Sequence, residues 1–433
     1  MTDANSTLSK LSPENKARLL KQLAQKAKMS NAEQEILTQQ PADWLTLDQR
    51  PLLTLFAAGE EANVDAVSIT CLNDRVVGNG FSLRDVTHGI CGDLPLLSNI
   101  RELPEGRIAT LTLPRTYGQI YSQSKDIVRL VEQSLHIAKS LGAKAVSLTG
   151  LIPSATDYGK AIRNSDDLPL ITTGHATTTS AVVLSLKKIL SESNRTLENE
   201  TVSFIGVGSV GSATLSLMLR VLPHPRSLTL CDIYSKQDEV EALMAHIRND
   251  LGYQGELRFV PSEKVCPEEV YESTTLIGAT NVPNVIDIAS LRPGTLIVDD
   301  SDPHCFDADK AVERCMENGD ILFTEGGALR APSVIQHRIY VPKKLEWALQ
   351  YPADDDNAHH ITGCILSSLL SGKFNYPSTL GFVEPDDAVV HYEALLGKGY
   401  QAANLHCGSW RVPRSIIADF RKVYGDKGEQ HGN

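Results

Sequence analysis

The amino-acid sequence predicts an α/β fold built on a doubly wound parallel sheet and joined to a second α/β domain, and three observations support this. Between residues 200 and 325, short apolar segments alternate with helical or loop segments, which is typical of a parallel sheet. A glycine-rich turn follows the first of these apolar segments, and an aspartate ends the second. The chain of 433 residues is also long enough for two or three domains with a large core.

The composition is that of an ordinary soluble globular protein, with 42% hydrophobic and 22% charged residues. No apolar stretch is long enough to cross a membrane, and the first residues lack the basic-then-apolar pattern of a signal peptide. Eight cysteines are scattered without a CxxC pair, which argues against a disulfide framework or a zinc site. We therefore expect free thiols in the cytoplasm. The formal net charge of −12 argues against nucleic-acid or anionic-membrane partners.

Residues 1–45 are expected to form a basic helical leader. The first 30 residues carry six lysine or arginine side chains and only two acidic ones. Ser12 suits an N-cap, Pro13 the first helical position and Glu14 the first turn, and apolar residues then recur at helical spacing. Two interpretations stay open: a surface helix packed on its own domain, or a docking segment for a partner.

Residues 46–170 are expected to form an α/β substrate domain, since this region mixes short strands with helices and has no nucleotide-binding motif. Its clearest helix covers residues 123–142, where five apolar residues share one face: Ile127, Leu130, Val131, Leu135 and Ala138. A strand is expected directly after it, at residues 143–151.

Residues 171–335 contain the strongest local pattern in the chain. A β-prone apolar segment at residues 201–205 precedes a G-x-G-x-x-G turn, and a helix follows. The first glycine allows the tight turn, the second lets the backbone approach a pyrophosphate, and the third permits close helix–strand packing. Amides at the helix N-terminus then hold the negative charge. The pattern predicts a Rossmann dinucleotide-binding domain, with a glycine-rich turn that binds no ligand as the alternative. Its predicted cofactor-binding residues are Gly206, Gly208, Ser209, Val210 and Gly211.

The second apolar segment of this domain ends on Asp232, 21 residues after Gly211, where a carboxylate is expected to bind the adenosine ribose. Such a carboxylate repels a 2′-phosphate, so the sequence favours NADH over NADPH, although Lys236 offers a phosphate contact. Thr280 and Asn281, at the end of a later apolar segment, complete the predicted cofactor site.

Residues 336–433 are expected to be C-terminal helices that close the cleft. The stretch NAHHITGCILSSLLSGKF places Cys364 on a helix expected to begin at residues 354–357 and to end near Gly372. At helical spacing Cys364 shares an apolar stripe, which by itself favours a thiol in the core. His360 lies one turn earlier on the same side, and an imidazolium there could lower the pKa of the thiol if the two groups are within hydrogen-bond reach.

Six segments occur in a particular order and spacing: LVEQSLHIAKSLGAKAVSLTGLIPS, TTGHATTTSAVV, IGVGSVGSA, LIVDDSDP, FTEGGAL and ITGCILSSLL. This ordered set resembles the long-chain acyl-[acyl-carrier-protein] reductase family, from roughly Pro51 to the helix of Cys364. Enzymes of that family reduce a carrier-bound fatty acyl thioester to an aldehyde. The resemblance implies a nicotinamide-binding Rossmann domain and maps the family's catalytic cysteine to Cys364. The family uses NADPH, whereas Asp232 argues for NADH.

The resemblance also implies a mechanism, in which Cys364 attacks the thioester carbonyl, expels the phosphopantetheine thiol and forms an acyl-enzyme that is reduced to the aldehyde by NAD(P)H. His175 is a candidate acid for the hydride step or an orienting donor. The family has Asn at this position and His two residues later, where this chain has Thr177, so a packing role for His175 is the alternative. The basic leader is similar to the helical leaders of peptide and polyketide assembly-line modules. That similarity implies reductive release from an acyl carrier protein, with acyl-CoA as the other source of thioester.

Two other functions stay open from the sequence. One is an NAD(P)-dependent dehydrogenase that acts directly on a small keto or amino acid, with Cys364 buried in the core. The other is a nucleotide-bound regulatory or scaffold protein without turnover.

Among the other thiols, Cys91 in the stretch GICGDLPLL is the one competing nucleophile. The pairs His304/Cys305 and His406/Cys407 suggest metal ligands, but neighbouring residues rarely point at one ion and no tetrahedral spacing accompanies them. We therefore expect no metal site.

Overall fold

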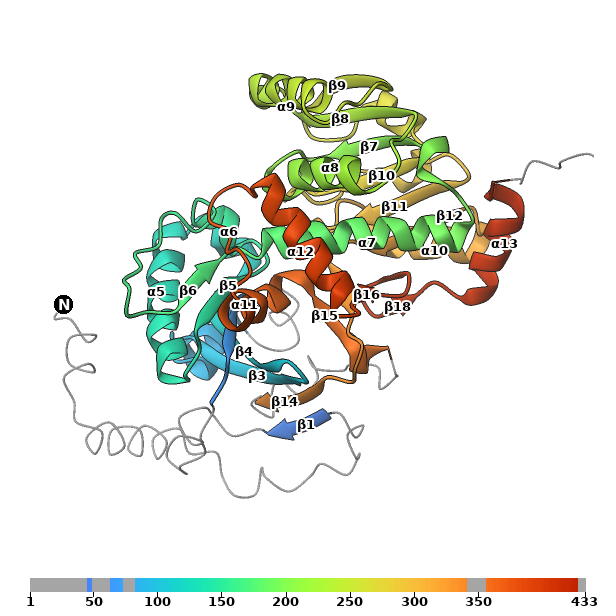
Figure 1. Cartoon of the computed structure of the whole chain (residues 1–433). Helices are drawn as coiled ribbons and strands as arrows, with labels where there is room; N and C mark the ends of the chain where they lie inside the picture. The colour runs from blue at the N-terminus through green and yellow to red at the C-terminus, as the bar shows by residue number, and fades with distance from the viewer. Residues whose placement is uncertain (1–44, 49–62, 73–81, 341–355, 427–433) are drawn as a thin grey trace, which may run out of the picture.

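The computed structural model describes residues 45–48, 63–72, 82–340 and 356–426 (Figure 1). The basic helical leader, interpreted as either a packed surface helix or a docking segment, lies almost entirely outside these residues. Within the described part of the chain, no helix is both long and apolar enough to span a bilayer.

Six parallel strands form the sheet that the sequence predicts after residue 200. They are β7 (Thr201–Ile205), β8 (Ser227–Ile233), β9 (Glu256–Ser262), β10 (Thr275–Gly278), β11 (Thr295–Asp299) and β12 (Ile321–Glu325). Their order in the sheet is β12-β11-β10-β7-β8-β9, all parallel. Counted along the chain, this is the 3-2-1-4-5-6 order of a Rossmann fold, which confirms the predicted fold class. The order reverses between β7 and β10, where such sheets form their ligand-binding crevice.

Four longer helices accompany this sheet: α7 (His175–Ser193), α8 (Ser209–Val221), α9 (Gln237–Asn249) and α10 (Ala308–Asn318). Short helical turns lie at Leu197–Asn199, Tyr234–Lys236, Glu268–Glu272 and Ile288–Ser290. Helix α7 packs along α8 and over β11 and β12, and most of its side chains are buried. It therefore forms a rigid support behind the crevice.

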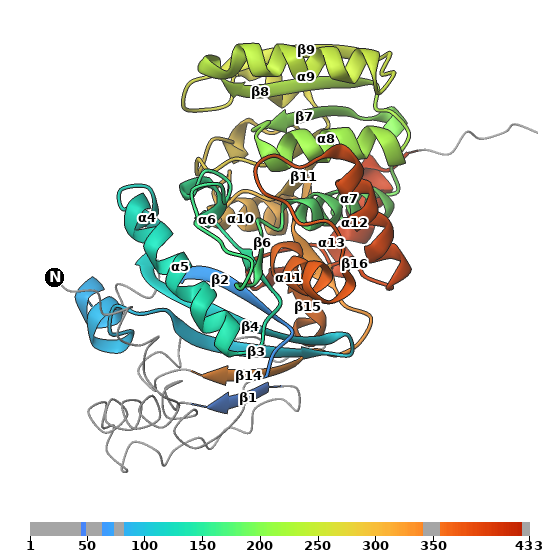
Figure 2. The ribbon, with the colours of Figure 1, turned by 60° about the vertical axis from the view of Figure 1, so that its left-hand side comes forward.

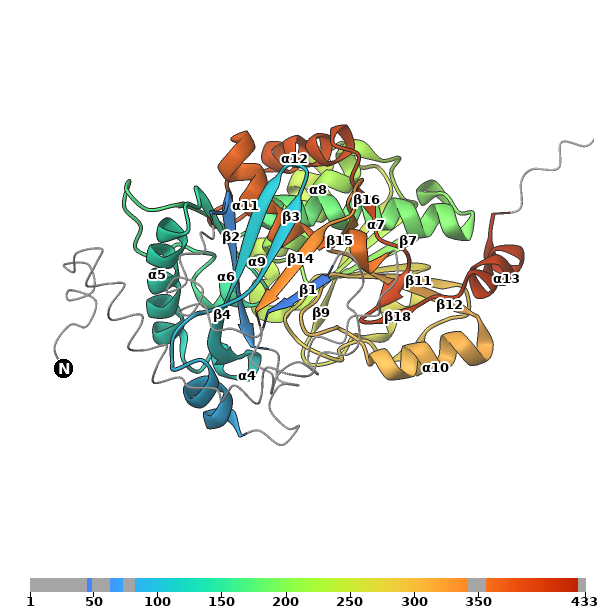
Figure 3. The ribbon, with the colours of Figure 1, turned by 90° about the horizontal axis from the view of Figure 1, so that it is seen from below.

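A second, mixed sheet of seven strands has the order β1-β14-β3-β4-β2-β5-β6 (Figure 3). The strands are β1 (Leu45–Asp48), β2 (Ala66–Leu72), β3 (Leu96–Leu103), β4 (Gly106–Thr116), β5 (Ala145–Leu148), β6 (Leu170–Thr172) and β14 (Gln336–Tyr340). Its helices are α4 (Tyr117–Ile120), α5 (Ser124–Ser140) and α6 (Ile152–Ala155). The apolar face predicted for α5 is buried at all five positions.

The C-terminal part of the chain differs from the expected set of helices. Strand β14 returns to the first sheet, where it pairs with β1 and β3. Further strands are β13 (Ala328–Arg330), β15 (His360–Thr362), β16 (Gln401–Ala402), β17 (His406–Cys407) and β18 (Trp410–Arg411). The helices are α11 (Gly363–Phe374), α12 (Pro385–Gly397) and α13 (Arg414–Tyr424).

The helix expected to begin at residues 354–357 begins at Gly363, so the prediction that His360 lies on it is wrong. The residues before Gly363 pair antiparallel with β13, with Ala328 opposite Thr362, and this pairing holds them extended. The helix ends at Phe374 rather than near Gly372, where a Cβ atom would lie 2.9 Å from that of Ala145. The lack of a side chain at Gly372 thus allows α11 to pack closely on β5.

Helix α11 joins the two halves of the molecule, since it packs on β2, β4, β5 and β6 and also on α7 (Figure 2). The N-terminal ends of α7 and α11 meet at two glycines. At Gly174, whose φ is +74°, a Cβ atom would lie 2.9 Å from the Cα of Cys364. At Gly363, a Cβ atom would lie 2.9 Å from the carbonyl oxygen of Thr177. This backbone contact fixes Cys364 beside the start of α7.

Candidate active site

A cavity of about 520 Å³ lies at the point where the strand order of the Rossmann sheet reverses. The glycine-rich turn after β7 lines part of it, and Cys364 at the start of α11 lines another part. His175, at the start of α7, borders it as well. The two domains thus share one cavity, which brings together most of the residues that the sequence singles out.

The three glycines of the turn have different surroundings. Gly206 has φ +86°, and a Cβ atom there would lie 2.5 Å from the carbonyl oxygen of Ala279. At Gly211 a Cβ atom would overlap the carbonyl oxygen of Gly206, so this residue permits the close packing of α8. Gly208 lines the cavity, and the nearest atom to a Cβ there is Tyr158 Oη at 3.9 Å. The turn therefore leaves open space at the N-terminus of α8, where an anion is stabilised.

Asp232, at the end of β8, also borders the cavity and is nearly buried. Its Oδ2 accepts a hydrogen bond from the backbone N of Val207 at 2.8 Å, and its Oδ1 accepts one from Ile233 at 2.8 Å. The Lys236 ammonium donates to Oδ2 at 3.3 Å and lines the same cavity. The carboxylate suits ribose hydroxyls and the ammonium suits a 2′-phosphate, so both cofactor forms stay open.

The remaining predicted cofactor residues gather at the same place. Ser209, Val210, Thr280 and Asn281 all line the cavity, whereas Gly211 lies beneath the turn. The backbone N of Thr280 donates to Ser301 Oγ at 3.1 Å. The Asn281 side chain donates to Tyr121 Oη at 2.8 Å, which links the loop after β10 to the first domain.

Cys364 is the second residue of α11 and is half-buried, unlike the other seven cysteines, all of which are buried. It faces the cavity, so the inference from helical spacing that it belongs to the core is wrong. Its Sγ lies 3.2 Å from Thr362 Oγ1. Burial raises the pKa of the Cys364 thiol to about 11, with the Thr362 hydrogen bond opposing this shift and the charge of Asp300 adding to it. The thiol is therefore protonated at neutral pH when the cavity holds no ligand.

His360 does not border this cavity. It lies on β15 and lines a second cavity of about 370 Å³, with its ring edge-on to that of His406 at 5.5 Å between centroids. Burial lowers the pKa of His360 to about 4, so the ring is neutral. The structure therefore gives no support to the idea that an imidazolium at this position activates Cys364.

His175 lies at the first position of α7, and its Nδ1 is 3.0 Å from Ser209 Oγ at the start of α8. The ring of Tyr158 stands edge-on to it at 6.0 Å. Burial lowers the pKa of His175 to about 4, so its imidazole is neutral and has one nitrogen able to accept a proton. It contacts the nucleotide-type turn and faces the cavity that Cys364 also faces.

Sequence reasoning missed a group of acidic residues at the carboxyl ends of β11 and β12. Asp299, Asp300, Asp302 and Glu325 all line the cavity. Burial, reinforced by the charges of Asp299 and Asp302, raises the pKa of Asp300 well above its usual range. Burial also raises the pKa of Asp302. The Asp300 carboxyl therefore binds a proton more tightly than an ordinary aspartate does. The signal was present in the segment VDDSDP, where acids follow an apolar strand.

Cys91, the competing nucleophile, directly follows the π-helical turn Asp85–Ile90 and is buried. Burial raises its pKa to about 12, and the charge of Asp93 adds to the shift. Cys91 is not among the described residues that line the two cavities.

The fold is α/β, with a Rossmann sheet and a second, mixed sheet. No family model matches the sequence, and no curated protein matches it significantly. Solved structures similar to the chain include L-tryptophan dehydrogenase from Nostoc punctiforme, at 12% identity over 77% of this chain and 88% of that one, with a TM-score of 0.32. A shikimate dehydrogenase in complex with NADP+ has 11% identity over 78% and 96%, with a TM-score of 0.33. Malic enzyme from Pyrococcus horikoshii has 13% identity over 86% and 83%, with a TM-score of 0.30. Such distant likeness does not identify a substrate or a reaction.

Proposed function

We propose that this protein is an NAD(P)H-dependent acyl thioester reductase that forms an aldehyde through an acyl-enzyme on Cys364. One observation carries the proposal: the half-buried Cys364 and the glycine-rich turn after β7 line the same cavity. A thiol placed beside a dinucleotide site can hold an acyl group next to a hydride donor, which converts a difficult bimolecular step into one within the complex.

The cofactor fits the residues that are present. The N-terminus of α8, opened by Gly208 and Ser209, would hold the pyrophosphate, and Asp232 with Lys236 would bind the adenosine ribose. Thr280 and Asn281 border the same path. When bound, NAD(P)H supplies the hydride that reduces the acyl group.

The chain's own residues supply the thiol and the protons. Attack by Cys364 on the thioester carbonyl forms a new S–C bond and breaks the bond to the carrier sulfur, which leaves as a thiol after taking one proton. The neutral ring of His175 can accept the thiol proton and pass it on. After reduction, the S–C bond breaks, the aldehyde leaves, and the Cys364 sulfur needs a proton. The Asp300 carboxyl, whose pKa burial raises well above its usual range, is the candidate donor, since it interacts electrostatically with this sulfur.

Acidic side chains dominate the charged lining of the cavity. Its end near Cys364 carries several carboxyl groups, and Lys236 is the one lysine or arginine among the described lining residues. That ammonium contacts Asp232, at the opposite, nucleotide-type end. A substrate carboxylate near Cys364 would therefore meet several acidic groups, with the His304 imidazole in the same cavity as a further group able to carry a positive charge, whereas a thioester carbonyl is neutral.

Intact mass measurement tests the proposal. The protein is incubated with acyl-CoA or an acylated carrier protein in the absence of cofactor, and we expect a mass gain equal to the acyl group. The gain should disappear in Cys364→Ser and persist in the control Cys91→Ser. NAD(P)H oxidation that survives Cys364→Ser would instead support the direct dehydrogenase. Tight nucleotide binding with neither result would support a protein without turnover.

A further inference from the structure

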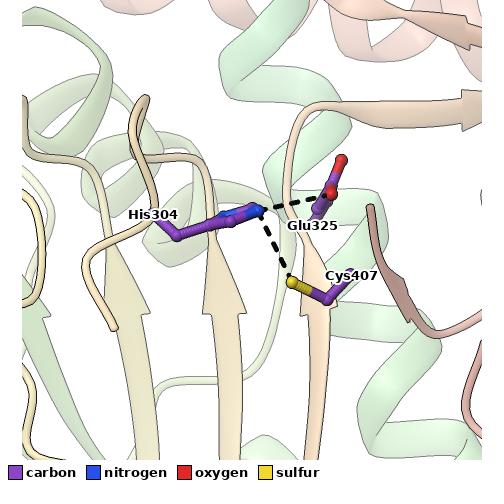
Figure 4. A group of neighbouring side chains, drawn as sticks. All are labelled: His304, Glu325 and Cys407. Atoms are coloured by element: carbon purple, nitrogen blue, oxygen red, sulfur yellow. Dashed lines mark hydrogen bonds and ion pairs between the residues drawn. The ribbon is translucent and has the colours of Figure 1, made fainter. Parts of the chain in front are cut away.

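We propose that His304, Glu325 and Cys407 bind one divalent transition-metal ion, with Zn²⁺ as the best match to the ligand set (Figure 4). The binding itself is independent of the proposed thioester reduction. The two His–Cys pairs had suggested no metal because neighbours in sequence rarely share an ion. In the structure, one member of each pair, His304 and Cys407, lies next to the other, although the two are 103 residues apart in the sequence.

Two distances between the ligand atoms match those around a tetrahedral ion. His304 Nε2 lies 3.4 Å from Cys407 Sγ and 3.6 Å from Glu325 Oε1, and the three ligand atoms all lie within 4.8 Å of one another. Zinc bonds of about 2.0–2.1 Å to nitrogen, 2.0–2.2 Å to oxygen and 2.3 Å to sulfur give tetrahedral edges of roughly 3.4–3.6 Å. An imidazole, a thiolate and a carboxylate together suit Zn²⁺ better than Mg²⁺ or Ca²⁺, which prefer oxygen ligands alone.

The three side chains come from elements that hold them in place. Glu325 ends β12, Cys407 lies on β17, which packs beside β12, and His304 lies in the loop between β11 and α10. The His304 ring stacks on Phe306 at 5.7 Å between centroids. The backbone N of Gly408 donates to Glu325 Oε1 at 2.6 Å. A site built on strand ends and stacked rings has little ordering entropy left to lose on binding an ion.

Two further contacts orient the ligands in the way that metal sites require. His304 Nδ1 lies 3.2 Å from Asp299 Oδ2, which leaves Nε2 directed at the cysteine and the glutamate (Figure 4). A carboxylate that binds the outer nitrogen of a histidine fixes its tautomer and makes it a stronger ligand. The other oxygen of Glu325 lies 3.5 Å from His406 Nε2, so this carboxylate is also held from behind.

The position of the cluster gives the ion a role in the cavity. Cys407 is buried, whereas the side chains of His304 and Glu325 are 30% and 27% exposed and line the cavity that Cys364 also lines. Three protein ligands with one side facing a cavity leave a coordination position for water or a substrate oxygen, which is the arrangement of catalytic rather than structural zinc sites. The chemical class of the fourth ligand is therefore a neutral or anionic oxygen donor.

Metal content of the full-length protein, measured by inductively coupled plasma mass spectrometry after incubation with Zn²⁺ and dialysis, tests the inference. We expect one zinc ion per chain, with at least about tenfold weaker binding in Cys407→Ser, Glu325→Gln and His304→Ala. Asp299→Asn should weaken binding about tenfold while the ligands remain. The controls Cys364→Ser and Cys315→Ser should retain the zinc. Far-UV circular dichroism of each variant separates loss of metal from loss of fold.

Replacement of zinc by Co²⁺ gives a second readout that does not depend on stability. A thiolate–cobalt charge-transfer band should appear in the wild-type protein. The band should vanish in Cys407→Ser, which lacks the thiolate. It should remain in Glu325→Gln, which keeps the thiolate, unless the whole site collapses. Substoichiometric zinc in the wild-type protein, or wild-type affinity in Cys407→Ser, would overturn the inference. Because no substrate is present, either result leaves the acyl-enzyme test of Cys364 unaffected.

Discussion

The ionisation of Cys364 gives the sharpest test of the site, and it needs no substrate. Burial raises the pKa of this thiol to about 11, from an ordinary value of 9.0. At pH 8 the thiolate fraction is then about 1 in 1,000, compared with about 1 in 10 for an ordinary thiol. Because alkylating reagents react with the thiolate, and a thiolate of higher pKa is intrinsically more nucleophilic, Cys364 should react about tenfold more slowly than a free thiol at this pH.

Removal of the Thr362 hydroxyl should slow the reaction further. Its oxygen lies 3.2 Å from the sulfur, and this hydrogen bond lowers the pKa of Cys364. A hydrogen bond to a charged group is worth about 1.5 kcal/mol, which corresponds to about one pKa unit. Thr362→Val should therefore reduce the alkylation rate about threefold, because the thiolate fraction falls about tenfold while the remaining thiolate becomes about threefold more reactive. The matched variant Thr362→Ser keeps the hydroxyl and should react like the wild-type protein.

The assay is alkylation by iodoacetamide between pH 7 and pH 10, with the Cys364 peptide quantified by mass spectrometry. The rate should rise about tenfold per pH unit across this range, since the thiol stays mostly protonated up to its pKa. A rate at pH 8 equal to that of a free thiol, or a plateau below pH 9, would refute the reasoning, because the thiol would then be activated in the resting protein.

Four other predictions concern the cofactor, the histidine and the leader. Gly208→Val should leave the melting temperature unchanged and weaken NAD(P)H binding at least about tenfold in a fluorescence titration, since the Cβ position at this glycine faces the cavity; unchanged affinity would count against a cofactor there. Asp232→Asn keeps an acceptor for the Val207 amide but removes the charge, so the ratio of dissociation constants should move toward NADPH, and a shift toward NADH would contradict the placement of the ribose. Burial lowers the pKa of His175 from 6.5 to about 4. As the pH falls, the unfolded chain therefore takes up a proton on this ring before the folded protein does. The stability contributed by the neutral ring is lost between pH 6.5 and about pH 4. Urea titrations should show that His175→Asn reduces the loss by up to about 3 kcal/mol, and an identical pH slope would show that the ring is not buried as a neutral group. Deletion of residues 1–30 should raise KM severalfold for an acylated carrier protein and spare acyl-CoA, whereas equal effects on both would argue against docking.

Local patterns predicted the Rossmann half of the molecule well. Apolar runs of four to seven residues and the glycine spacing depend on neighbours along the chain, and β7, β8 and the turn between β7 and α8 lie where these patterns place them. The requirement for glycine at position 206 follows from a positive φ, which is a property of the turn itself. The position of the glycine-rich turn beside the cavity was therefore predictable from the sequence.

The substrate side was harder to predict because it depends on contacts between distant segments. The periodicity around Cys364 suits a helix that begins several residues earlier, but pairing with β13 holds His360 in a strand. Strand β14 leaves the C-terminal region to pair with β1, close to the N-terminus. The exposure of Cys364 to the cavity depends on the meeting of α7 and α11 at Gly174, which no spacing within one helix reveals.

The raised pKa of Cys364 has two opposing effects on the proposed cycle, one on the reactivity of the thiolate and one on its fraction. A thiolate of higher pKa is intrinsically more nucleophilic, with a Brønsted slope of about 0.4–0.5, so two pKa units give roughly an eightfold gain in reactivity. The same two units reduce the thiolate fraction about a hundredfold at neutral pH, so the resting thiol is the weaker nucleophile by about an order of magnitude. This deficit disappears if a neighbour removes the proton as the thioester binds, and the neutral His175 ring borders the cavity for that step. Once the aldehyde forms, the raised pKa of the Asp300 carboxyl favours this group as the proton donor that returns the sulfur to the thiol. A site that keeps its thiol protonated until a carbonyl arrives protects the sulfur from oxidation between turnovers, since oxidants also attack the thiolate.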